Sequence, residues 1–144
     1  MKTTDKLIVV EQTFDCSVEA LWNSLTDIEE MRKWYFENIP DFKPLVGFET
    51  QFNVQSEERN FLHKWKVIEV EFLKKIKYTW EYGEYPGKST SEFEILDEGN
   101  ETKLKLTVEV LEDFPDDVPE FRRESCIGGW EYFLKGRLKD YLKK

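Results

Sequence analysis

The chain has 144 residues, of which 21 are basic and 30 acidic, so its formal net charge is −9 at pH 7. That length fits one domain, residues 1–144, with a sizeable core. The acidic excess argues against the phosphate backbone of nucleic acid or an anionic membrane surface as a partner. Aromatic residues make up 15% of the chain, a share that either fills a large core or lines an apolar pocket.

The chain has no apolar run of the roughly 20 residues that cross a bilayer. Acidic residues also interrupt the first 14 residues, where a signal peptide would need a continuous apolar stretch. We therefore expect a cytoplasmic protein with no membrane insertion. Cys16 and Cys126 lie far apart without metal-ligand spacing, so both are expected to be thiols in a reducing compartment. Neither a metal nor a cofactor is predicted.

Six segments have the alternation of apolar and polar residues that is typical of half-buried strands. In residues 61–70 the parity of the apolar positions changes, which predicts a β-bulge near Lys66 to Ile68. The clearest alternation is in residues 76–82, where the even-numbered positions are all apolar or aromatic. The six segments are 7–14, 48–54, 61–70, 76–82, the stretch around Phe93 and Ile95, and 102–111.

Three segments have helical periodicity. Residues 18–25 follow Ser17, a residue type that favours the N-cap. A second short helix follows Asp27, which together with Glu30 has the spacing of a capping box. The longest pattern runs from Pro119 to Leu142, with the proline in the first turn. Its apolar stripe consists of Ile127, Trp130, Leu134, Leu138 and Tyr141.

This order of elements predicts an α+β domain. We expect a curved antiparallel sheet of about six strands, two short helices after the first strand, and a long C-terminal helix across the sheet. The segment 35–46, which contains two prolines and no clean period, is expected to cross the domain as a loop. Two outcomes are open for the space under the last helix: a cavity, or a core that the aromatic side chains fill completely.

Few residues are candidates for chemistry. His63 is the only histidine, so a catalytic triad or a two-histidine metal site would depend on it alone. It is either a satisfied polar group near a sheet end or an acid or base that faces a cavity. Cys126 is not predicted to be an activated nucleophile, because the sequence offers no second histidine and establishes no basic group beside the thiol. No catalytic residue is assigned.

Four residues of the last helix raise separate questions. Arg123 falls on the apolar stripe and must find an anion, which is either a carboxylate of the protein or an acidic ligand. Gly128, Gly129 and Gly136 lie on the opposite side, where each lowers helix stability by about 1 kcal/mol relative to alanine. Either they let a loop or a partner approach closely, or they are tolerated surface residues.

Four segments are similar to those of a known family. VEQTFDCSVEALWNSLTDIEEMRKWY is similar to its opening strand and tryptophan-containing helix. LVGFETQF, VIEVEFLKKIKYTWEY and GGWEYFLKGRLKDYL are similar to its glycine-marked strand, its Glu-containing strand with the Thr-Trp strand that follows, and its Gly-Trp helix. The chain thus resembles the activator of heat-shock-protein-ninety ATPase homologue family of the START-like (SRPBCC) superfamily. Cys16-Ser17 and Phe48 depart from the family pattern, which has a small residue with proline and a second glycine there.

The resemblance implies the helix-grip fold, with a cavity between the concave sheet and the last helix, but no common catalytic set. Members of the superfamily bind lipids, hormones or polyketides, and some are cyclases or aromatases. We therefore expect a stress-related protein or one that binds a small hydrophobic or amphipathic ligand, and binding rather than catalysis. The residues expected to line the cavity are Phe52, Phe61, His63, Trp65, Tyr78, Trp80, Phe93, Arg123, Trp130 and Leu134.

Two alternatives to ligand binding stay open. The first is a protein that contacts a chaperone and modulates its ATPase, which the family resemblance alone implies. The second is an enzyme of the cyclase or aromatase type, which would need a polar group such as His63 or Tyr78 in the pocket as acid or base.

Overall fold

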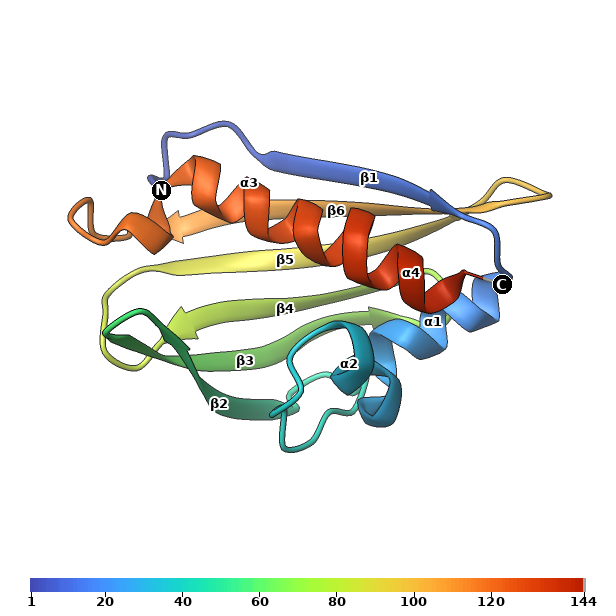
Figure 1. Cartoon of the computed structure of the whole chain (residues 1–144), viewed down its shortest axis with the longest axis horizontal. Helices are drawn as coiled ribbons and strands as arrows, with labels where there is room; N and C mark the ends of the chain where they lie inside the picture. Colours follow the sequence, from blue (N-terminus) through green and yellow to red (C-terminus); the bar gives the residue numbers. More distant parts are fainter. Residues whose placement is uncertain (144) are drawn as a thin grey trace.

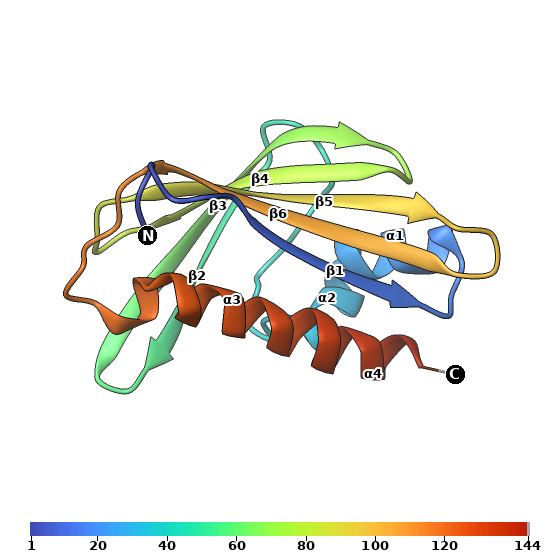
Figure 2. The ribbon, with the colours of Figure 1, turned by 90° about the horizontal axis from the view of Figure 1, so that it is seen from above.

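The computed structural model describes residues 1–143 as two layers, an antiparallel sheet and a long helical segment that crosses one face of it (Figures 1 and 2). The six strands follow the order β1-β6-β5-β4-β3-β2, so β1 and β2 form the two edges. The predicted α+β helix-grip architecture is confirmed. The strands are β1 (Ile8–Phe14), β2 (Glu49–Ser56), β3 (Arg59–Glu71), β4 (Lys75–Tyr82), β5 (Lys88–Asp97) and β6 (Thr102–Glu112).

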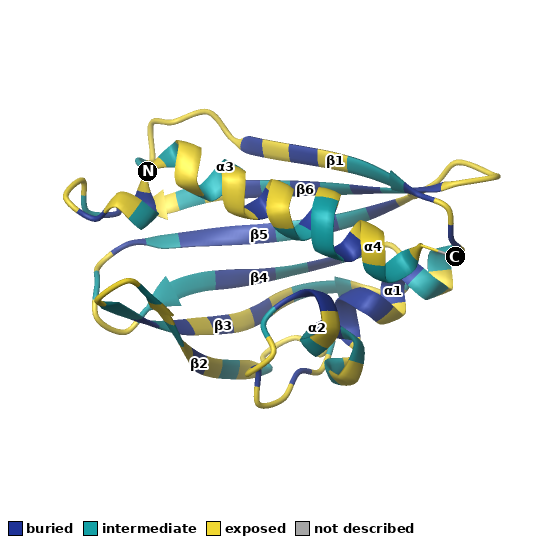
Figure 3. Cartoon of the chain, viewed as in Figure 1, coloured by how far each residue is buried: buried dark blue, intermediate teal, exposed yellow. Residues whose placement is uncertain are grey.

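Burial along the strands follows the predicted alternation. In β1, Ile8 and Val10 are buried, whereas Val9 between them is 48% exposed. Figure 3 shows buried residues along the strands that pass beneath the helix, and exposed residues on the outer side of the helix itself. One face of the sheet therefore supplies the core, because side chains of successive strand residues point to opposite faces.

The predicted β-bulge in β3 is confirmed. Val67 pairs with Tyr78 of β4, but the next pair joins Glu69 to Lys77, so Ile68 is the extra residue. Ile68 is 40% exposed and Val67 is buried. The bulge lets the strand change the parity of its apolar residues without losing its pairing with β4.

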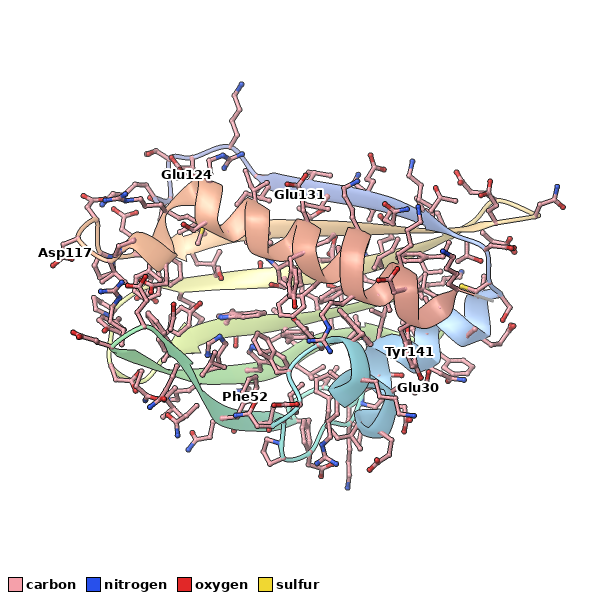
Figure 4. All side chains as sticks on the ribbon, viewed as in Figure 1. Glu30, Phe52, Asp117, Glu124, Glu131 and Tyr141 are labelled. Carbon is pink, nitrogen blue, oxygen red and sulfur yellow. The ribbon has the colours of Figure 1, made fainter. Side chains whose placement is uncertain are left out.

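The two short helices lie beside the long one, at one end of the same face of the sheet (Figure 1). Helix α1 (Val18–Thr26) begins at Ser17, whose hydroxyl accepts a hydrogen bond from the amide of Ala20 at 3.1 Å, as predicted. Helix α2 (Ile28–Trp34) follows Asp27, but the Asp27 side chain caps nothing, so the predicted capping box is wrong. Glu30 instead accepts a hydrogen bond from the Tyr141 hydroxyl at 2.9 Å, a long-range contact that draws its carboxylate away from the helix start (Figure 4).

The long helix begins four residues later than predicted. Pro119–Phe121 form a separate 3-10 turn (η1), and Arg122 is extended, with ψ 149°. Phe121 is buried against Phe114, and we attribute the break to this contact, which holds the turn away from the helix axis. The helical segment comprises α3 (Arg123–Glu131), the π-helical stretch η2 (Tyr132–Leu138) and α4 (Lys139–Leu142).

The apolar stripe of the helical segment faces the sheet as predicted. Trp130, Leu134 and Leu138 are buried, while Ile127 and Tyr141 are half-buried. In a regular α-helix, positions eight residues apart drift by about 80° around the axis. The wider turn of a π-helix reduces that drift and keeps Trp130 and Leu138 over the same strip of the sheet.

The core has two parts. The larger lies between the sheet and the three helices and contains residues of every main element. A smaller cluster at the other end of the sheet joins β3 to the segment before the long helix. It consists of Phe61, Phe114, Val118 and Phe121, with Met1, Tyr82, Tyr85 and Val110 packed against it. The space between the two clusters is where the candidate site lies.

The three helix glycines do not serve close packing within the described part of the chain. A Cβ added at Gly128, Gly129 or Gly136 would meet no neighbouring heavy atom within 4 Å. Of the two alternatives, the approach of another described segment is therefore excluded. Substitution by alanine has room at each position.

Candidate functional site

A pocket of about 120 Å³ lies between the sheet and the first turns of α3. Strands β4, β5 and β6 form its floor, α3 and the start of η2 form its roof, and the smaller aromatic cluster closes one end. Seven of its fifteen lining residues are aromatic: Phe36, Trp80, Tyr82, Phe114, Phe121, Trp130 and Phe133. The aromatic side chains of the domain thus leave one small space under the helix unfilled.

The roof and the floor of the pocket meet through ring contacts. The Trp130 ring on α3 lies 5.5 Å from that of Trp80 on β4, edge to face. The rings of Phe36 and Phe133 lie 5.0 Å apart, and they join the loop after α2 to the long helix. Such pairs fix the orientation of the rings. The shape of the pocket wall is therefore determined by contacts among the lining residues themselves.

Two serines of β5 carry hydroxyls on the pocket floor. Ser89 and Ser91 are only 4% and 1% exposed, and both line the pocket. Across the β4–β5 ladder, Ser89 stands opposite Trp80 and Ser91 opposite Tyr78. Among residues 1–143, neither hydroxyl makes a hydrogen bond to another side chain or to the backbone. The floor therefore offers two serine hydroxyls that have no protein partner among the described residues.

Tyr82 adds a third hydroxyl to the pocket. Its oxygen accepts a hydrogen bond from the Trp80 indole nitrogen at 2.9 Å. Burial raises the pKa of the Tyr82 hydroxyl well above its usual value, so the proton stays on the oxygen at neutral pH. The Tyr82 O–H therefore keeps a proton that it can donate, and Tyr82 lines the pocket.

The other polar groups of the pocket are already engaged. Burial acts to raise the pKa of Glu120, but hydrogen bonds from Arg59 at 2.8 and 3.1 Å, from Ser56 and from the backbone, together with the Arg59 charge, outweigh it. The pKa is therefore lowered and the carboxylate stays charged. Ser125 donates its hydroxyl proton to the Pro119 carbonyl at 2.9 Å. Burial raises the pKa of Cys126 to about 11. Cys126 is therefore a neutral thiol, as its sequence context predicts.

His63 lies next to the pocket but does not line it. Its ring stacks on Phe52 at 5.3 Å, and its Nδ1 lies 3.0 Å from the Phe61 carbonyl oxygen. Burial lowers the pKa of His63 to about 4. The sequence left two interpretations of His63, a satisfied polar group or an acid or base that faces a cavity. The structure favours the first.

The other predicted lining residues lie mostly around the pocket. Trp80 and Trp130 line it, while Phe61 belongs to the smaller aromatic cluster. Tyr78 bonds hydroxyl to hydroxyl with Tyr35 at 2.9 Å, and Trp65 has an indole nitrogen with no hydrogen-bond partner in the described chain. Five of the residues predicted to line the cavity belong to the main core instead: Phe52, Trp65, Tyr78, Phe93 and Leu134.

Arg123 lies outside the pocket. The sequence predicts an anion as its partner, but in the structure its partners are backbone carbonyl groups. Its guanidinium donates to the carbonyl oxygens of Lys6 and Leu7 at 2.5 and 3.3 Å. Lys135, three turns further along, donates to the carbonyl of Glu11 at 3.0 Å. Both side chains therefore hydrogen-bond to carbonyl groups of the edge strand β1 and of the residues before it. The sequence pattern does not reveal that these carbonyl groups lack a strand partner.

The serines and Tyr82 were missed by the sequence prediction, although a signal for the serines existed. In the segment STSEFEI, Ser89 and Ser91 share parity with Phe93 and Ile95, the two residues that marked the fifth strand. Extending that alternation toward the N-terminus would have placed both hydroxyls inside. Polar residues are usually assigned to the outer face, which hides such positions.

The structure also bears on metal and membrane sites. Across residues 1–143 there is no group of three or more His, Cys, Asp or Glu side chains placed to hold a metal ion. In that same part of the chain, no helix is both long and apolar enough to cross a membrane.

Comparisons with known proteins agree with the fold. No curated protein sequence matches the chain significantly. Protein CV1439 from Chromobacterium violaceum superposes with a TM-score of 0.79 at 17% identity, over 96% of this chain and 97% of that one. The Aha1 dimer from Colwellia psychrerythraea gives 0.72 at 21%, over 96% and 97%.

DynU16, a protein of the dynemicin biosynthetic locus, gives a TM-score of 0.77 at 18% identity. It is longer, since the match covers 97% of this chain and 48% of DynU16. At these identities the similarity establishes the fold. A family model described as "Activator of Hsp90 ATPase homolog 1-like protein" matches residues 15–143. The chain therefore belongs to the family of activator of Hsp90 ATPase homolog 1-like proteins.

Proposed function

We propose that the protein binds a small hydrophobic ligand in the pocket between the sheet and α3. The observation that carries this proposal is the pair of buried serines, Ser89 and Ser91, in a lining that is rich in aromatic side chains. A pocket with a mostly apolar lining and a few convergent polar groups is the usual form of a small-molecule site. A core that served stability alone would fill this space with apolar groups, whereas both serines line it.

The size of the pocket limits the ligand. Its volume of about 120 Å³ is below the roughly 300 Å³ at which sites for drug-sized molecules begin. Lipids, hormones and polyketides, which the wider superfamily binds, are larger than this space. The proposal is therefore restricted to small molecules in the state of the protein described here.

A blocking variant gives the test. Gly129 lines the pocket, whereas its neighbour Gly128 does not, and neither has a heavy atom within 4 Å of an added Cβ. Gly129→Leu should abolish binding of toluene or benzene, followed as a shift in melting temperature and by ligand-observed NMR. Gly128→Leu is the matched control and should bind as the wild type does. No binding of any apolar probe to the wild type would end the proposal.

Modulation of a chaperone ATPase is the second candidate, which rests on the family assignment. A direct test adds the protein at saturating concentration to the host chaperone and measures ATP turnover. An increase that persists in Gly129→Leu would separate this role from the pocket. Unchanged turnover would remove the candidate.

The cyclase or aromatase alternative receives no support from the pocket. It needs an acid or base in contact with the substrate, but His63 and Tyr78 both lie outside the pocket lining. Burial raises the pKa of the remaining hydroxyl candidate, Tyr82, away from neutrality. The geometry favours binding over acid-base turnover.

A further inference from the structure

We propose that the pocket selects a neutral, single-ring aromatic molecule that carries a hydroxyl or carbonyl oxygen, the class of which phenol is the simplest member. Its ring would lie against the Trp80 and Trp130 rings, which contact each other, and its oxygen would bond to Ser89, Ser91 and Tyr82. This inference rests on the proposed function and gives it a ligand class. Three properties of the pocket carry it: size, hydrogen-bonding capacity and charge.

Size favours one ring. An engineered protein cavity of about 150 Å³ lined by apolar side chains binds benzene, and the pocket here has about 120 Å³. The edge-to-face contact of Trp80 with Trp130, at 5.5 Å, leaves ring faces and edges at the pocket wall, against which another ring can stack or pack edge-on. A fused two-ring molecule would require the roof to move.

Hydrogen-bonding capacity favours an oxygen on that ring. Each serine hydroxyl can donate one hydrogen bond and accept others, and neither has a partner among the described residues. The Tyr82 oxygen accepts from Trp80 at 2.9 Å and keeps its own proton for donation. In the empty pocket only water can pair with these groups. A ligand that displaces this water loses affinity unless it restores the hydrogen bonds, which an oxygen-bearing ring does and a hydrocarbon does not.

Charge favours a neutral ligand. The one carboxylate in the lining, Glu120, is already paired with Arg59 at 2.8 Å and would repel an anion. The Met1 ammonium lies at the same end of the pocket, where it donates to the Phe121 carbonyl at 2.8 Å. No Lys or Arg side chain is part of the described lining, and the Met1 ammonium already bonds to the Phe121 carbonyl. A carboxylate held at the serines would therefore be desolvated with no unengaged cation beside it.

The experiment compares phenol, toluene and benzoate at pH 7 by calorimetry and NMR titration. We expect phenol to bind at least about 5-fold more tightly than toluene, and benzoate to bind more weakly than both. Ser89→Ala and Ser91→Ala should each weaken phenol binding by about 3- to 10-fold, the range for one hydrogen bond, and leave toluene unchanged or tighter. Thr90→Ala is the matched control, because Thr90 is a buried residue on the opposite face of the same strand.

The melting temperature of the protein without added ligand gives a second readout. Because the serine hydroxyls have no protein partner, the double variant with alanine at both positions should melt at or above the wild-type temperature. Equal affinities for phenol and toluene, or a phenol affinity that the serine variants do not change, would overturn the ligand class while leaving the proposed function intact. Tighter binding of benzoate would do the same. Failure of all three probes to bind would instead overturn the proposed function.

Discussion

The hydroxyl of Tyr82 accepts a hydrogen bond from the indole of Trp80, two residues before it on β4, at 2.9 Å. Both side chains point to the inner face of the sheet, and both line the pocket. The bond leaves the Tyr82 proton available for donation and helps to hold the Trp80 ring in place. One contact therefore sets both a polar and an apolar feature of the site.

Replacement of Tyr82 by phenylalanine tests this arrangement. The variant loses the donor toward the pocket and leaves the Trp80 nitrogen without its acceptor, so we expect phenol affinity to fall by about 3- to 10-fold and stability by about 1 kcal/mol. Toluene affinity should stay the same, since the ring remains. Titration calorimetry and urea unfolding measure the two effects. An equal loss of affinity for both ligands would show that the variant disturbs the shape of the pocket instead.

The buried histidine predicts a pH dependence of stability. The folded state keeps His63 neutral down to a pKa of about 4, whereas the unfolded state takes up the proton near 6.5. The unfolded state thus binds more protons between these values, so stability is lost as the pH falls through that window. Between pH 7 and pH 5 the loss attributable to His63 should be about 2 kcal/mol.

His63→Phe removes this titration, while the carboxylates of the protein remain. Urea unfolding of both proteins at pH 7 and pH 5 isolates the histidine contribution as the difference between the two changes. The variant should lose about 2 kcal/mol less than the wild type. Identical losses would mean that His63 is protonated in the folded state at pH 5.

Arg123 should stabilise the edge of the sheet. Its two hydrogen bonds to the carbonyls of Lys6 and Leu7 connect α3 to the start of β1, and Arg123→Ala should cost about 1 kcal/mol and speed amide exchange in β1. Arg122→Ala is the matched control, because the Arg122 side chain is exposed and makes no hydrogen bond within residues 1–143. Equal effects of the two substitutions would contradict the assigned role.

Gly128 should be a site where alanine stabilises the protein. It is exposed inside α3, and an added Cβ meets no neighbouring heavy atom within 4 Å. Gly128→Ala should therefore raise the free energy of unfolding by up to about 1 kcal/mol through helix propensity. A loss of stability would indicate that the glycine serves a contact which the isolated chain does not show.

Strand and helix patterns predicted most of the fold because they depend on local periodicity. The parity change in residues 61–70 was sufficient to place the bulge around Ile68, since every strand residue must face one side or the other. The Ser17 cap was predicted for the same reason, because its partner is three residues away. The prediction of a capping box at Asp27 was wrong. The Glu30 carboxylate accepts a hydrogen bond from Tyr141 instead, which lies 111 residues away in the sequence.

The candidate site was harder to predict, since it depends on which contacts the fold leaves unmade. Trp80 and Trp130 were expected at the pocket and line it. The sequence does not reveal that the Arg123 guanidinium donates its hydrogen bonds to the backbone of the residues before β1. It also does not reveal that Ser89 and Ser91 are enclosed without partners. Both facts follow from long-range packing, which periodicity does not encode.

The most direct measurement of the central claim is the position of bound phenol in the wild-type protein. We predict intermolecular NOEs from the phenol ring protons to the Trp80 and Trp130 indoles and to the Ser91 side chain, all of which line or adjoin the pocket under α3. The contrasting position is the exposed groove beside Phe72 and Leu96, which are 74% and 36% exposed. NOEs confined to that groove would contradict the account.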